Sequence, residues 1–160
     1  MTLKDLVLDH LTYTYEKEAW QPSLAMAVEG LTALQAAWKP AAERHSIWQI
    51  VRHVTHWKRS VLEAWDGNPM DYEELERTDW PEASGDDAAW QADAPELHRI
   101  SQEFRRRVEA LDDKALSQPH VPYKGKAEWA QPLGIRLVRM ATHDIYHAGQ
   151  IRHLRALQGV

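Results

Sequence analysis

The chain has 160 residues, of which 44% are hydrophobic and 27% charged, and its formal net charge at pH 7 is −5. This length and composition predict one globular domain over residues 1–160, and the negative charge argues against a nucleic-acid partner held through phosphate contacts. The absence of cysteine excludes disulfides, thiolate metal ligands and a cysteine nucleophile.

The sequence carries no sign of export or membrane insertion. Residues 1–5 lack the charged-then-apolar pattern of a signal peptide, and no apolar run is long enough to span a bilayer. The lack of cysteine also fits a reducing compartment. We therefore expect a cytoplasmic protein that contacts no membrane.

Three helical segments are predicted before residue 40. The first covers residues 3–19, because apolar residues recur there at helical spacing. A short helix is expected over residues 23–28, where Gly30 ends it, and one further turn over residues 33–37, closed by Pro40. One face of the first helix carries Leu3, Leu6, Val7 and His10.

A second long helix is predicted over residues 46–65. Ser46 is a suitable N-cap, since its hydroxyl can accept a hydrogen bond from a free backbone N–H of the first turn. The run from Asp66 to Pro69 contains glycine and proline and ends the helix. Residues 70–85 are acidic and irregular in pattern, and we expect a long loop there.

A third helix should begin after Asp86 or Asp87, either of which can act as its N-cap. Pro95 falls inside this helix and predicts a kink or a break, because proline removes one backbone hydrogen bond. The longer half of the helix is expected over residues 94–111.

The last long helix follows a second long loop, expected over residues 112–131. It should start at Pro132, a favourable first position, and end near Leu157 before Gly159. Four long amphipathic helices without strands predict an all-α fold, namely a four-helix bundle with long connections.

Two histidines stand one turn apart on this last helix. His143 and His147 lie roughly 40° apart around the axis, on the side that carries Met140, Ile151 and Leu154. Both imidazoles are therefore expected to point into the bundle. A pair at this spacing can hold one divalent metal ion from a single helix face.

A third histidine lies on the inner face of the second long helix. His53 should point inward as well, whereas His56 lies about 60° away and is the substitute ligand. A third imidazole would complete a site that leaves one coordination position open. The residues that share the face of His53 are Ile50, Trp57, Val61 and Ala64.

The pattern alone leaves two interpretations open. Among nine histidines, chance gives about half of one such spaced pair, and core histidines with a hydrogen bond are common. In favour of a metal, three buried imidazoles would each need a partner and one ion satisfies all three. Gly149 interrupts the last helix, which suggests close approach by another element.

Three stretches of the chain resemble the DinB/YfiT-like proteins. The run from Ser46 to His53, with Trp57 after it, resembles the second helix of that family, and the run from His143 to Ile151 resembles its last-helix motif. The pair Asp79–Trp80 resembles a recurring feature before the third helix. The similarity follows nearly the whole chain in order and spacing.

The resemblance implies a four-helix bundle with a divalent metal held by His53, His143 and His147, all of which match. Three neutral imidazoles suit zinc, nickel, iron or copper; we expect zinc first, with nickel fitting as well. Such a site can activate a bound water or a small-molecule thiol. Related branches include thiol-dependent S-transferases, maleylpyruvate isomerases and metal-dependent hydrolases, and family members often form homodimers.

Three functional hypotheses follow. The first is a metalloenzyme of the S-transferase or hydrolase type that acts on a small molecule, such as a low-molecular-weight thiol. The second is a non-catalytic metal-binding or stress-response protein with the same fold. The third is a metal-free bundle used for protein contacts. The fold alone does not choose among them.

Other residues have candidate supporting roles. Arg136 and Arg139 could bind an anionic substrate group, or form a solvated charged face. Trp57 could line the substrate pocket, or simply pack in the core. Asp144 could accept a hydrogen bond from a ligand imidazole, or pair on the surface with a lysine or arginine. Gln150 is expected to pack at a helix interface.

Overall fold

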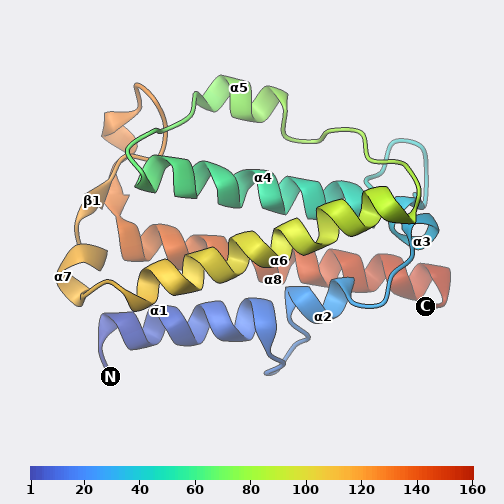
Figure 1. Ribbon diagram of the computed structural model, residues 1–160, viewed down its shortest axis with the longest axis horizontal. Helices are drawn as coiled ribbons and strands as arrows, with labels where there is room; N and C mark the ends of the chain where they lie inside the picture. Colours follow the sequence, from blue (N-terminus) through green and yellow to red (C-terminus); the bar gives the residue numbers. More distant parts are fainter.

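Four long helical segments form the body of the molecule and run along its long axis (Figure 1). The computed structural model describes residues 1–160. The four segments confirm the predicted all-α bundle. Its core helices are α4 (Ile47–Trp65), α6 (Asp87–Glu109) and α8 (Leu133–Gln158), and α1 (Leu3–Leu11) continues into the π-helical turn η1 (Thr12–Glu16). None of these helices combines the length and apolar character that a bilayer crossing requires.

The first segment is shorter than predicted. It ends at Glu16 rather than at residue 19, because Lys17 adopts an extended conformation and its N–H closes the wider turn on the Thr12 carbonyl. Leu6, expected on the inner face, is 47% exposed, whereas Val7 is fully buried.

Two short helices follow as predicted, α2 (Leu24–Val28) and α3 (Ala33–Ala37). Ser23 caps the first, accepting a hydrogen bond from the backbone N–H of Met26. Thr32 caps the second in a reciprocal pair of hydrogen bonds with Gln35.

Helix α4 begins and ends where the sequence predicts. The Ser46 hydroxyl accepts from the N–H of Gln49, whose side chain accepts from the N–H of Ser46. After Trp65 the chain turns through Gly67, which has a φ of +84° that favours glycine. Helix α4 therefore extends to Trp65 and includes all of the inward-facing residues that the sequence predicts for it.

The predicted loop over residues 70–85 contains a helix, α5 (Tyr72–Arg77), and this part of the prediction was wrong. Asp71 caps it, and Leu75 is its one buried residue. A single buried side chain gives no repeating apolar pattern, so helical spacing in the sequence did not predict α5.

Helix α6 is unbroken across Pro95, so the predicted break is not present. The carbonyl left without a donor belongs to Gln91, and both residues are exposed, so water can satisfy it. Asp86 is the N-cap, one of the two residues expected.

The predicted loop over residues 112–131 holds several short elements: α7 (Asp113–Leu116), β1 (Pro119–His120), the 3₁₀ turn η2 (Ala127–Trp129) and β2 (Gln131–Pro132). The two strands pair antiparallel, so the expectation of no strand was wrong at this small ladder. Helix α8 then starts at Leu133, one residue later than predicted, and is closed by Gly159 with a φ of +75°.

A buried ion pair separates two apolar clusters in the core. One cluster includes Trp48 and Tyr15, and the other includes Phe104. Between them the Lys58 ammonium lies 5.2 Å from the Tyr15 ring centroid and 5.4 Å from that of Phe104. Lys58 Nζ donates to Asp144 Oδ2 at 2.7 Å, which joins α4 directly to α8.

Candidate metal centre

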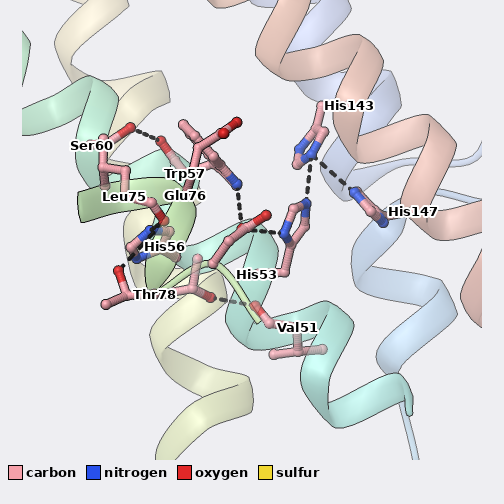
Figure 2. A network of polar contacts seen from close by, with 12 residues as sticks. Val51, His53, His56, Trp57, Ser60, Leu75, Glu76, Thr78, His143 and His147 are labelled. Atoms are coloured by element: carbon pink, nitrogen blue, oxygen red, sulfur yellow. Dashed lines mark hydrogen bonds and ion pairs between the residues drawn. The ribbon is translucent and has the colours of Figure 1, made fainter. Parts of the chain in front are cut away.

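The three histidines singled out from the sequence meet at the contact between α4 and α8. Figure 2 shows the imidazoles of His53, His143 and His147 pointing toward one another. The Nε2 atom of His143 lies 3.0 Å from that of His53 and 2.9 Å from that of His147. One ligand atom from each residue falls within a group no wider than 4.8 Å. Helical phase therefore predicted correctly that the three side chains face inward.

The outer ring nitrogens of two histidines are fixed by oxygen acceptors. His53 Nδ1 lies 2.6 Å from Asp79 Oδ1, and His147 Nδ1 lies 2.7 Å from Gln150 Oε1. A carboxylate or amide oxygen can only accept, so each Nδ1 carries the proton. The Nε2 lone pairs of both rings are left facing the centre.

Burial keeps the three imidazoles neutral at pH 7. It lowers the pKa of His53 to about 2, of His143 to about 3 and of His147 to about 4, with the neighbouring imidazoles adding to the effect for the first two. Neutral imidazoles are the form that binds a metal ion.

The donor set fits a divalent ion. Tetrahedral zinc with bonds of about 2.0–2.1 Å places its ligand nitrogens about 3.3 Å apart. The separations of 2.9 and 3.0 Å between Nε2 atoms lie close to that spacing. Without an ion, His143 can place only one proton on its Nε2 atom. The Nε2 lone pairs of His53 and His147 would then both have to accept that one proton.

Asp79 supports the centre, and the sequence did not reveal its role. It lies between α5 and α6, and its Oδ1 atom also accepts from Trp57 Nε1 at 2.6 Å. Trp57, expected to touch substrate or to pack in the core, thus holds the carboxylate that orients His53. Burial raises the pKa of Asp79, while the Trp57 hydrogen bond lowers it. The adjacent pair Asp79–Trp80 was the only sequence signal at this position.

Trp80 covers the outer face of the centre. Its ring stacks on His53 at 3.9 Å between centroids and on the exposed His45 at 3.8 Å on its other face. Together with the acceptor on Nδ1, this stacking fixes both the plane and the rotation of the His53 ring.

The two remaining candidates near the centre contact other groups. The Asp144 carboxylate is fully buried and bonds Lys58 rather than an imidazole, so it neither orients a ligand nor forms the expected surface pair. His56, the substitute ligand, points away from the centre, with its Nε2 3.1 Å from the Leu75 carbonyl oxygen (Figure 2).

Gln150 and Gly149 differ from what was expected. Gln150 bonds His147 instead of only packing at a helix interface. A Cβ atom added at Gly149 would meet nothing within 4 Å, so the predicted close approach by another element was wrong. The helix tolerates this glycine without requiring it.

The two candidate arginines lie on α8 before the histidines and do not reach them. Arg136 donates to the Tyr123 hydroxyl at 2.7 Å, and Arg139 donates to the Gln131 side chain. Both line a cavity of about 380 Å³ on that side of the centre. A second cavity of about 500 Å³ lies on the other side and is lined in part by Trp80 and Gln150.

The comparison with protein families points in the same direction. The family model described as the DinB superfamily matches residues 17–151, which is most of the chain and includes all three histidines. Among curated proteins, none matches the sequence.

Proposed function

This chain belongs to the DinB superfamily, and from that premise we propose that it holds one divalent metal ion on His53, His143 and His147. The observation that carries the proposal is the convergence of three neutral imidazoles, each with an Nε2 atom at the centre. Zinc is the ion we propose first, and nickel suits the same nitrogen ligands.

We propose further that the protein is an enzyme for a small molecule, of the thiol S-transferase or hydrolase type. The group that can hold an ion contains three side chains, which leaves a coordination position for an outside ligand. A metal bound there would lower the pKa of a coordinated water or thiol.

The surrounding residues have positioning roles in this proposal. Asp79 holds the proton on Nδ1 of His53, and Gln150 does so for His147, so that both Nε2 atoms remain free to bind. Trp80 excludes water from one face of His53. These contacts support a centre that is shaped before any ligand arrives.

A non-catalytic metal-binding or stress-response protein is the alternative. The observation in its favour is the low exposure of the centre, with His53 6% and His147 2% exposed. The half-buried His143 is the ring that an incoming ligand would meet first.

An activity screen separates the two proposals. The metal-loaded protein is offered small thiols with electrophilic acceptors, and separately activated esters. His143→Ala is measured in parallel with His10→Ala, which changes a histidine of α1 that lines neither cavity beside the centre. Turnover that His143→Ala abolishes and His10→Ala retains supports the enzyme. If the protein binds metal but turns over none of these substrates, the enzyme proposal fails and the non-catalytic one stands.

We also propose a cytoplasmic homodimer that binds neither nucleic acid nor membranes. The net charge of −5 supports the first of these exclusions, because a phosphate backbone would be repelled.

A further inference from the structure

A cavity beside the metal centre is enclosed largely by aromatic rings and arginines. We call it the aromatic cavity; it lies between α5, the connection over residues 121–130 and the first turns of α8, and its volume is about 380 Å³. The residues that line it are Tyr72, Pro122, Tyr123, Trp129, Gln131, Arg136 and Arg139.

Three rings form the walls of the aromatic cavity. The centroid of Tyr72 lies 4.9 Å from that of Tyr123 and 5.1 Å from that of Trp129, and the last two are 5.8 Å apart. The rings meet tilted or edge to face, the arrangement in which aromatic groups attract one another. Such walls suit a flat, unsaturated ligand.

The two arginines of the aromatic cavity lack an acidic partner. Arg136 donates to the Tyr123 hydroxyl and Arg139 to the Gln131 amide, and neither forms an ion pair. The Nε atom of Arg136 is buried without any hydrogen-bond partner. Arg136 is half-buried and lies over the Tyr123 ring at 4.9 Å from its centroid, and Arg139 is exposed, so both guanidinium groups keep N–H donors that an anion can accept from.

None of the carboxylates around the aromatic cavity, Glu128 beside Trp129 among them, pairs with Arg136 or Arg139. Glu73 is paired with Lys126 at 3.0 Å, and Glu76 accepts a hydrogen bond from the Tyr72 hydroxyl. Asp144, the one acidic residue of α8, is bonded to Lys58. The positive charge of the two arginines is therefore not cancelled from within the chain.

The aromatic cavity lies before His143 along α8, and none of the three histidines lines it. Arg139 precedes His143 by one turn and Arg136 precedes it by two, which corresponds to about 6 and 10 Å along the axis. Trp57, which bonds Asp79 behind His53, meets the Tyr123 ring edge to face at 6.3 Å. A small molecule held by the arginines can thus extend toward the centre.

We propose that the aromatic cavity binds a planar organic anion, with its carboxylate on Arg136 and Arg139 and its flat body among Tyr72, Tyr123 and Trp129. This inference rests on the proposed function and names its substrate class: an unsaturated or aromatic carboxylate. The carboxylate would lie one to two helical turns before His143 along α8.

The test is calorimetric titration of the full-length, metal-loaded protein with benzoate, which is both flat and anionic. Benzamide keeps the ring without the charge, and cyclohexanecarboxylate keeps the charge without the flat ring. The variants are Arg139→Gln in the cavity, Arg152→Gln as the matched exposed arginine of α8, and Arg44→Gln in the second cavity beside the centre. His143→Ala reports binding directly to the metal.

We expect benzoate to bind with a dissociation constant of about 1 mM, as small ligands do, and both analogues to bind about tenfold more weakly. Arg139→Gln should weaken benzoate binding about tenfold. Arg152→Gln, Arg44→Gln and His143→Ala should leave it unchanged. Melting curves confirm that the Arg139 variant is folded.

Three results overturn the inference: no benzoate binding, binding that Arg139→Gln leaves intact, or binding that only His143→Ala or Arg44→Gln removes. The metal content of every sample is measured separately. A protein that binds metal but not benzoate refutes this inference alone, whereas one that binds benzoate but no metal refutes the proposed function alone.

Discussion

A single oxygen atom, Asp79 Oδ1, joins the segment between α5 and α6 to two residues of α4. It accepts hydrogen bonds from His53 Nδ1 and from Trp57 Nε1, each at 2.6 Å, and it belongs to the segment between α5 and α6. Because its partners lie one turn apart on α4, the carboxylate fixes the rotamer of the histidine against a rigid neighbour. The geometry of the centre therefore depends on a residue that would not touch the ion.

Removal of this carboxylate should weaken metal binding. We expect Asp79→Ala to reduce zinc affinity about 10- to 100-fold, since the ring of His53 loses both its orientation and its basic partner. Competition against a chromophoric chelator measures the change. Glu82→Gln removes the same charge from the same segment without touching a histidine and should bind as the wild type does. Wild-type affinity in Asp79→Ala would show that the contact has no role.

At the scale of elements, the contact between α4 and α8 combines the centre with the buried pair Lys58–Asp144. Asp144 directly follows His143, and Lys58 lies five residues after His53, so the ion pair lies beside the three imidazoles. Burial raises the pKa of Asp144, whereas Lys58 lowers it. The pair thus fixes how the two helices that carry the ligands meet.

Loss of one partner of this pair should cost more than loss of both. Lys58→Met leaves a buried carboxylate unpaired and should lower the free energy of unfolding by about 3–5 kcal/mol. The double variant Lys58→Met/Asp144→Leu removes both charges and should regain part of that loss. Urea unfolding measures both. Equal destabilisation of the single and double variants would argue against an ion pair as the source.

The two glycines inside α8 should respond differently to alanine. Gly149→Ala should raise the free energy of unfolding by about 0.5–1 kcal/mol, because its Cβ meets nothing within 4 Å and alanine favours the helix. At Gly134 the Cβ would lie 3.3 Å from the Leu116 carbonyl oxygen, which should cancel the gain. Urea unfolding distinguishes them, and a destabilised Gly149→Ala would reveal a contact that the structure lacks.

At the scale of the whole molecule, the features that depend on neighbouring residues could be predicted from the sequence. Ser46 and Asp86 cap α4 and α6, and Gly67 and Gly159 follow the ends of α4 and α8, because caps and turns are local. The bundle and the inward direction of the three histidines follow from helical period, which is also a property of each helix alone.

Contacts between distant segments could not be predicted in this way. The partner of His53 comes from residue 79, and no rule of spacing links the two. The charge of Lys58 suggests a surface residue although its helical neighbours Val54 and Val61 are apolar, and a carboxylate from another helix allows its burial. Helix α6 continues across Pro95 because the carbonyl that loses its donor faces water. Whether that carbonyl faces water depends on which side of α6 packs against the other helices.

The homodimer expected from the family resemblance is supported by the exposed surface. Large apolar side chains remain on it, among them Trp20 at 103%, Leu34 at 85% and Tyr146 at 63% exposure. Burying such groups favours association. Sedimentation velocity should give about twice the chain mass of 18.5 kDa, and a single species of the chain mass at all concentrations would contradict the prediction.

The central claim is that three imidazoles hold one ion, and elemental analysis of untagged protein tests it most directly. The protein is dialysed against zinc and freed of unbound ion, in parallel with alanine variants of His53, His143, His147 and His56. We predict about one ion per chain in the wild type and in His56→Ala, whose ring bonds the Leu75 carbonyl, and almost none in the other three variants. A wild-type protein without metal, or full occupancy in any of those three variants, would contradict the account.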